Sequence, residues 1–328
     1  MFAKKTLVAA AALFAAVGAQ AQSSLNVYGN LDVAVGSFEN VVLNGSAVKS
    51  QRTTRVESGI EAGSFIGFKG QEDLGGGLKA IFKLESVIGM DTGATTTNMW
   101  TRTSELGLTG GFGTVTLGNS LSLNFLANAT YNPFPVTGAL NVSENLLGHS
   151  VGIGSFRVAV DESFRQNAVT YTSPNLAGFT LAAQYGAAEA SNTDDTYALQ
   201  ANYTVGKLSV GGTYTDFDDR KAWQVGASYD FGVVKTFGQY AQAKYDGAPV
   251  TYKFYQLGVA VPVTANSAVL ASFGEGKYDE IRLRQFSAAY DYSLSKRTGV
   301  YAGLLYDYAK AGNSDNGTTY AVGLRHAF

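Results

Sequence analysis

Cysteine is absent from this sequence of 328 residues, and only five residues are proline. The lack of cysteine excludes a disulfide framework and a cysteine-based zinc cluster. No Pro-rich linker, charge run or low-complexity tract divides the chain into domains. The formal net charge is −2, so the chain lacks the basic excess expected of a nucleic-acid-binding protein.

Long apolar runs are also missing beyond the N-terminal segment, which excludes membrane-spanning helices in the rest of the chain. What is abundant is glycine (39 residues), tyrosine (19) and phenylalanine (19). The mean hydropathy is near zero. A chain of this kind can satisfy its backbone in lipid only as a closed β-barrel that keeps its polar side chains inside.

The N-terminal segment has the three parts of a secretory signal. Lys4 and Lys5 are followed by an apolar stretch over 6–18, and Ala19 and Ala21 form a small-x-small cleavage site. The apolar stretch is too short to span a bilayer. We therefore predict a signal peptide over 1–21 and an exported chain over 22–328.

The last strand predicted from the sequence, 317–328, alternates two kinds of side chain. Small or polar residues such as Arg325 occupy one face. The opposite face is mostly apolar and broad, and we interpret it as facing lipid; it consists of Tyr320, Val322, Leu324, His326 and Phe328. A barrel with its apolar side outward has a wet interior, so this strand predicts a channel.

Alternating segments of about ten residues continue along the chain between two kinds of connection. Tight turns rich in Gly, Asn and Asp alternate with longer polar loops, including 38–54 and 310–316. Fifteen such connections predict an all-β fold: a sixteen-stranded antiparallel transmembrane barrel with both termini in the periplasm.

The connection over 120–164 is much longer than the others and contains Pro133 and Pro135. Long loops in compact folds are usually functional. A barrel of sixteen strands is too wide for its own side chains to fill. We therefore predict that 120–164 folds inward as the third extracellular loop and narrows the lumen.

Several segments resemble the general diffusion porins of Gram-negative bacteria, most closely the beta-proteobacterial and neisserial group. The matching segments are 28–32 (YGNLD), 66–70 (IGFKG), 72–82 (EDLGGGLKAIF), 107–118 (GLTGGFGTVTLG), 171–179 (YTSPNLAGF), 294–298 (LSKRT) and 323–328 (GLRHAF). The resemblance implies an outer-membrane homotrimer in which each barrel passes ions and small hydrophilic solutes by passive diffusion. It implies no enzyme activity and no cofactor. The implied partners are outer-membrane lipid, lipopolysaccharide and the barrel-assembly machinery that reads the C-terminal strand.

The resemblance also implies a charged constriction, with basic side chains on the barrel wall facing acids on the third loop. Arg102 and Lys69 match the basic positions in their segments, and Arg165 matches one approximately. By strict alternation Arg165 would face outward, so its role requires a bulge. Two basic positions of the family are occupied by Phe65 and Asn30.

Acidic candidates for the same constriction come from two places. Glu144 lies within the long loop, and Asp161 and Glu162 end it. Asp32 and Glu61 are expected to face the lumen by alternation. With fewer wall cations than arginine-rich relatives, we expect a weaker anion preference, or a cation preference.

Glu105 departs from the family pattern, which has an outward aromatic residue at this position. An outward charge in lipid costs about 2 kcal/mol at mid-depth. We therefore expect Glu105 at a subunit interface or near a rim.

Other chemistries have weak support. Residues 148–152 (GHSVG) match a nucleophile elbow around Ser150, but no helix pattern follows. His149 and His326 lie at opposite ends of the predicted barrel, so no metal site is expected. A substrate-selective channel and a plugged structural or adhesive barrel remain open alternatives.

Overall fold

The computed structural model describes residues 24–44, 47–95, 98–135, 138–148, 151–153, 156–158, 163–189 and 194–328. The predicted signal peptide and its cleavage site lie outside the described residues, as do His149, Ser150, Asp161 and Glu162. None of the helices in the described ranges is long and apolar enough to cross a membrane.

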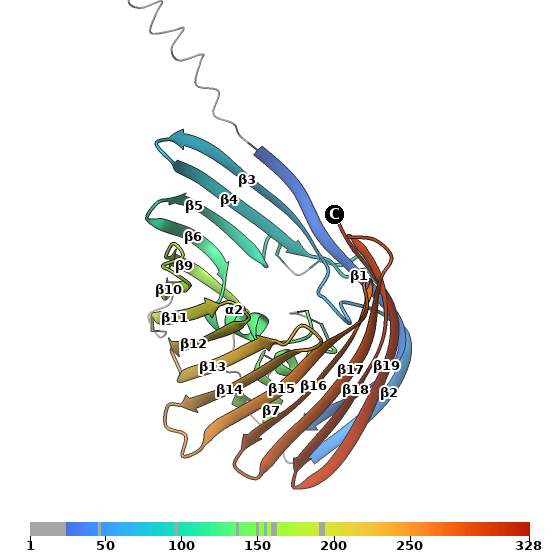
Figure 1. The fold of residues 1–328 in the computed structure, drawn as a ribbon. Helices are drawn as coiled ribbons and strands as arrows, with labels where there is room; N and C mark the ends of the chain where they lie inside the picture. The colour runs from blue at the N-terminus through green and yellow to red at the C-terminus, as the bar shows by residue number, and fades with distance from the viewer. Residues whose placement is uncertain are drawn as a thin grey trace, which may run out of the picture.

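Antiparallel strands make up most of the described chain (Figure 1). The strands of the large sheet are β1 (Ser24–Asn44), β2 (Ala47–Ser58), β3 (Phe65–Gly75), β4 (Leu78–Val87), β5 (Thr103–Gly110), β6 (Gly113–Leu121), β9 (Phe164–Thr172), β10 (Phe179–Gly186), β11 (Thr196–Val205), β12 (Leu208–Asp216), β13 (Arg220–Asp230), β14 (Lys235–Tyr245), β15 (Thr251–Thr264), β16 (Ser267–Tyr278), β17 (Ile281–Ser293), β18 (Thr298–Ala311) and β19 (Asn313–Ala327).

Pairing between the first and last strands closes the sheet into a barrel. Asn30 of β1 lies opposite Ala327 of β19, and the backbones of Gly29 and Phe328 exchange two hydrogen bonds of 3.2 Å. The other strands pair with their neighbours in chain order, except that β2 and β3 pair with different halves of β1. β2 and β3 together occupy one strand position in the barrel. The barrel therefore has sixteen strand positions, which confirms the predicted fold.

Side chains on the outer surface are apolar, as the alternation predicted. In β19 the side chain of Val322 is 60% exposed, whereas that of Ala321 on the inner face is 4% exposed. Tyr320 and Leu324 are exposed with Val322. The predicted orientation of this strand is confirmed: its apolar face points away from the barrel interior.

The connections differ from the prediction at one end of the barrel. The predicted tight turns are all present, for example between β11 and β12 at Gly206 and Lys207. However, the loops predicted over 38–54 and 310–316 are largely strand: β1 and β2 stay paired as far as Asn44 and Ala47. These strands extend beyond the apolar band, where alternation of apolar and polar side chains is no longer required.

The predicted strand over 57–72 is interrupted. β2 ends at Ser58 and β3 begins at Phe65, and residues 59–64 between them form no strand. The interruption lies where another segment of the chain approaches the wall from inside. Alternation alone gives no signal for such a tertiary contact.

Between β6 and β9 the chain forms a helix, α2 (Leu123–Thr130), a π-helical turn, η1 (Glu144–Gly148), and a small separate hairpin of β7 (Val151–Ile153) and β8 (Phe156–Val158). The Ser122 hydroxyl caps α2 by accepting a hydrogen bond of 3.1 Å from the Phe125 amide. We call residues 122–135 and 138–148 the inserted segment.

Candidate functional site

The inserted segment lies against the inner face of the barrel (Figure 1). Glutamines that project inward hold its backbone: Gln200 Nε2 donates to the Leu123 carbonyl at 3.2 Å, and Gln239 Nε2 donates to the Tyr131 carbonyl at 2.8 Å. On the neighbouring strand, Gln224 is only 1% exposed because the segment covers it. These buried amides position one side of the passage through neutral hydrogen bonds.

Glycines on the wall make room for the bulky side chains of the inserted segment. A Cβ at Gly226 would collide with the Tyr131 ring, and one at Gly258 would collide with Pro133. The Tyr131 hydroxyl donates to Asn202 Oδ1 at 3.2 Å. Burial raises the pKa of the Tyr131 phenol, so it remains a neutral donor. The segment therefore fits closely against the wall.

The far end of the inserted segment meets residues 59–64, where the second barrel strand is interrupted. The Leu140 amide donates to the Ile60 carbonyl at 3.0 Å. Asp32 holds this interruption from the other side, because its carboxylate accepts hydrogen bonds from the Ile60 and Ala62 amides at 3.1 Å each and from the Tyr301 hydroxyl at 2.8 Å. The structure thus gives Asp32 an anchoring position.

Glu61 and Asn30 also belong to this junction. Glu61 Oε2 pairs with Arg325 Nη1 at 2.9 Å, and the other terminal nitrogen of Arg325 pairs with Asp291 at 2.9 Å. Asn30 donates to the Gly63 carbonyl at 3.1 Å. Glu61 is fully buried, and it shares the Arg325 guanidinium with Asp291.

The opposite side of the passage is formed by inner side chains of β1, β3, β4 and β5, which we call the uncovered wall. Cross-strand register arranges these residues in successive rows. The first row contains Tyr28, Gly67, Glu85 and Thr103; the second contains Asn26, Lys69, Lys83 and Glu105; the third contains Ser24, Gln71, Ile81 and Gly107. Lys69 is exposed, in contrast to the glutamines beneath the inserted segment.

Glu85 is the centre of the first row. Its carboxylate accepts hydrogen bonds from the Tyr28 hydroxyl at 2.6 Å and the Thr103 hydroxyl at 3.1 Å, and it pairs with Arg102 Nε at 3.0 Å. The Arg102 guanidinium also lies 4.5 Å from the centre of the Phe65 ring. The Phe65 ring therefore packs against the Arg102 guanidinium, and the Glu85 carboxylate neutralises the charge of that guanidinium.

Lys69 and Glu105 lie one row further along the uncovered wall. Lys69 Nζ is 4.4 Å from the centre of the Tyr28 ring. Glu105 Oε1 pairs with Lys83 Nζ at 3.0 Å, while the neighbouring side chain of Leu106 points outward and is 63% exposed. The expectation that Glu105 projects outward, to a subunit interface or a rim, is therefore wrong. The strand register puts it on the inner face, where Lys83 balances its charge.

Arg165 points inward because β9 contains the required bulge. The register between β6 and β9 shifts between Gly118 and Ser120, and Asn167 has a φ of 49°. Val169, beyond the bulge, is outward and exposed. Arg165 Nη1 donates to the Thr196 hydroxyl at 3.2 Å.

The inserted segment contributes no exposed acid among its described residues. Glu144 is its one acidic residue and is 7% exposed, and the segment contains no lysine or arginine. Leu126 and Thr130 are its exposed side chains on α2. Asp161 and Glu162, the other acids expected here, are outside the described residues. One side of the passage therefore presents no exposed charged side chain over its described length.

Tyr28, Lys83 and Glu85 are not among the site residues predicted from the sequence. A signal was available, because alternation from Lys79 places Lys83 and Glu85 on one face of a single strand. Their pairing with Arg102 and Glu105 depends on register between strands, which alternation does not give. In the described ranges, no group of three or more His, Cys, Asp or Glu residues could hold a metal ion.

Comparisons with known proteins all match this chain to outer-membrane porins. A family profile described as Gram-negative porin matches residues 7–326. The outer membrane porin protein 32 of Delftia acidovorans is 31% identical, with 99% of this chain and 100% of the relative covered. The major outer membrane protein P.IB of Neisseria meningitidis serogroup A is also 31% identical, with the same coverage.

Among solved structures, the anion-selective porin from Comamonas acidovorans superposes with a TM-score of 0.79 at 26% identity, covering 94% of this chain and all of that one. The Salmonella typhi OmpF structure has a TM-score of 0.66 at 15% identity, which shows a shared fold. These similarities extend over nearly the whole chain.

Proposed function

This chain belongs to the Gram-negative porin family, and we propose that its passage is a weakly selective one, bounded by an inserted segment whose described residues expose no charge and by a wall whose charges are mostly paired. The protein is an outer-membrane channel rather than an enzyme. Ions and small hydrophilic solutes cross it by diffusion. They pass between the inserted segment and the uncovered wall.

Charge pairing on the wall is the observation that carries this proposal. Arg102 is paired with Glu85 and Lys83 with Glu105. A charge whose counter-charge lies about 3 Å away presents mainly a dipole to a passing ion, so it favours neither sign strongly. Lys69 has no carboxylate within ion-pair distance among the described residues, and this leaves a small bias toward anions at its position on the wall.

The similarity to a porin named anion-selective is compatible with that bias but does not fix its size. Selectivity depends on the charges at the narrowest point. Here Phe65 and Asn30 occupy two positions where the family resemblance implies cations. We therefore propose a weaker anion preference for this chain than for arginine-rich relatives.

Reversal potentials test this proposal directly. The purified protein, inserted into a planar lipid bilayer under a roughly tenfold KCl gradient, is expected to conduct with a small reversal potential of the sign that indicates anion preference. A large reversal potential of either sign would show that unbalanced charges dominate the passage. Absence of conductance from folded protein would contradict the channel itself.

The assembled form is a second proposal. An outer-membrane protein of Vibrio cholerae with the same fold is described in a trimer form, and the family resemblance implies a homotrimer. We expect three chains in outer-membrane lipid and lipopolysaccharide, delivered after removal of residues 1–21 and inserted by the barrel-assembly machinery through the last strand. The mass of the detergent-extracted complex, corrected for bound detergent, should equal three chains; a one-chain mass would contradict it.

A further inference from the structure

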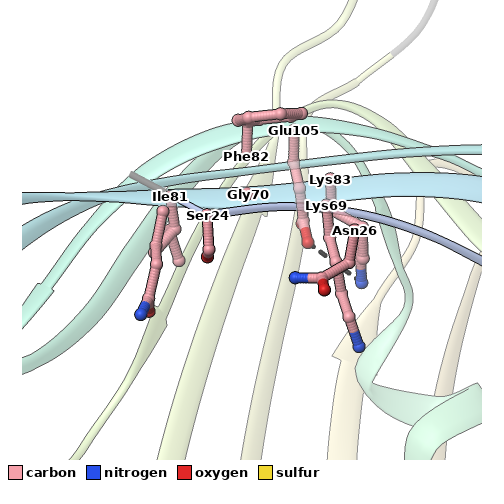
Figure 2. A pocket seen from close by; sticks show the side chains of 9 residues that line it. Ser24, Asn26, Lys69, Gly70, Ile81, Phe82, Lys83 and Glu105 are labelled. Carbon is pink, nitrogen blue, oxygen red and sulfur yellow. Dashed lines mark ion pairs between the residues drawn. The ribbon is translucent and has the colours of Figure 1, made fainter. Parts of the chain in front are cut away.

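A cavity of about 420 Å³ lies on the uncovered wall (Figure 2). Its polar lining comes from the second and third rows, with Asn26, Lys69 and Lys83 projecting to the same side and Glu105 reaching toward Lys83. Ile81 adds an apolar side chain to the lining, one row further along. The cavity therefore combines cations, amides and an apolar surface in one place.

The charges in this cavity do not balance. Lys69 lies directly opposite Lys83 in the register of β3 and β4. Like charges at facing positions of a sheet destabilise it. Glu105 relieves one of the two cations by pairing with Lys83 at 3.0 Å. Lys69 contacts the Tyr28 ring, and no carboxylate in the described part of the chain lies within ion-pair distance of it. One positive charge thus remains.

We propose that this cavity is a binding subsite for small organic monocarboxylates with a short apolar body. The carboxylate would lie between Lys69 Nζ and the Asn26 amide, and the body would rest along Ile81. A single negative charge matches the single excess cation. A dianion would meet Glu105, whose charge disfavours a second negative group. This inference rests on the proposed channel function and names a solute class for it.

Benzoate, its uncharged analogue benzamide and the dianion succinate are suitable probes. Each is added at matched concentration to the protein in a planar bilayer bathed in KCl, and the fractional block of the current is measured. Benzoate is expected to block saturably and more strongly than benzamide or succinate. Equal block by benzoate and benzamide would overturn the subsite, whereas conductance in KCl alone reports separately on the channel.

Two substitutions test whether benzoate blocks the current by binding in this cavity. Lys69→Gln is expected to raise the half-blocking concentration of benzoate about threefold to fivefold, because an exposed ion pair of this kind contributes modestly. The matched control is Lys79→Gln, a lysine on the same face of the adjacent strand, β4, but outside the cavity lining. The control should leave the benzoate block unchanged. Equal weakening by both substitutions would mean a general field effect and would overturn the subsite.

A third substitution should change which charge the cavity prefers in a blocking solute. Glu105→Gln removes the acid that pairs with Lys83, so the cavity gains a second free cation. Succinate is then expected to block more strongly than benzoate, the reverse of the order in the unmodified protein. An unchanged order would contradict the assignment of Lys83 and Glu105 to this cavity.

Discussion

At the scale of single residues, Glu85 determines how much of the charge of Arg102 reaches the lumen. It pairs with Arg102 at 3.0 Å and accepts two further hydrogen bonds from Tyr28 and Thr103. An arginine in a porin wall does not by itself make the passage attractive to anions. Its contribution depends on the acid beside it, and here that acid comes from a neighbouring strand.

We expect Glu85→Gln to shift the reversal potential toward anion preference. Glutamine can still accept the Tyr28 hydrogen bond, but it leaves the Arg102 charge unbalanced in the passage. The matched control is Glu72→Gln, which removes the same charge from an exposed position near the tight turn after β3. Equal shifts in the two variants would show that the local pairing with Arg102 has no part in selectivity.

Individual wall residues were predictable from the sequence, but the residues that pair with them across strands were not. The bulge that turns Arg165 inward shows how far strand alternation can predict the orientation of a side chain. The residue type and position suggested an inner side chain, alternation contradicted it, and the structure resolves the conflict through Asn167 in a left-handed conformation. The family pattern predicted the wrong face for Glu105, because the register with Lys83 that puts it on the inner face cannot be derived from the sequence.

At the scale of elements, the inserted segment owes its position to neutral contacts. Gln200 and Gln239 bind its backbone, and Gly226 leaves space for Tyr131. Neutral hydrogen bonds and packing are little affected by ionic strength, unlike exposed ion pairs. The described part of the segment should therefore keep its place over a wide range of salt concentration.

Gly226→Val should disturb this fit. A Cβ at this position would overlap the Tyr131 ring, and overpacking of this kind typically costs about 1–3 kcal/mol. We expect a folded barrel whose single-channel current is noisier and whose mean conductance is altered. The control is Gly238→Val, where the nearest atom to an added Cβ, on Leu257, is 3.6 Å away. Identical currents from both variants would contradict a role for this contact in holding the segment.

Turns and strands differ in how well the sequence indicates them. The tight turns were predictable because Gly, Asn and Asp at fixed positions satisfy a local geometric demand. The ends of β1 and β2 were not, because the polar residues in this part of the sequence resemble a loop. The break over 59–64 depends on Asp32 and on the distant inserted segment, and neither is a local signal.

At the scale of the whole molecule, the barrel follows from hydropathy and alternation together. Apolar side chains cover the outside, and the inside carries polar side chains together with a buried apolar cluster between the wall and the inserted segment. The sheet must close because open edges in lipid would leave backbone groups unpaired. The need to pair every backbone group in lipid is what made a closed β-barrel predictable from the sequence. It could not give the path of the inserted segment, which depends on shape complementarity between residues far apart in the chain.

The seam between β1 and β19 has a kinetic consequence. Asn30 pairs with Ala327, so the strands that meet there are separated by nearly all of the described chain. Contacts of such long sequence separation form slowly. Until they form, both margins of the growing sheet expose unsatisfied amides and carbonyls that invite aggregation with other molecules. Protection of these margins, or catalysis of the final closure of the barrel, would therefore shorten the interval in which the chain can aggregate.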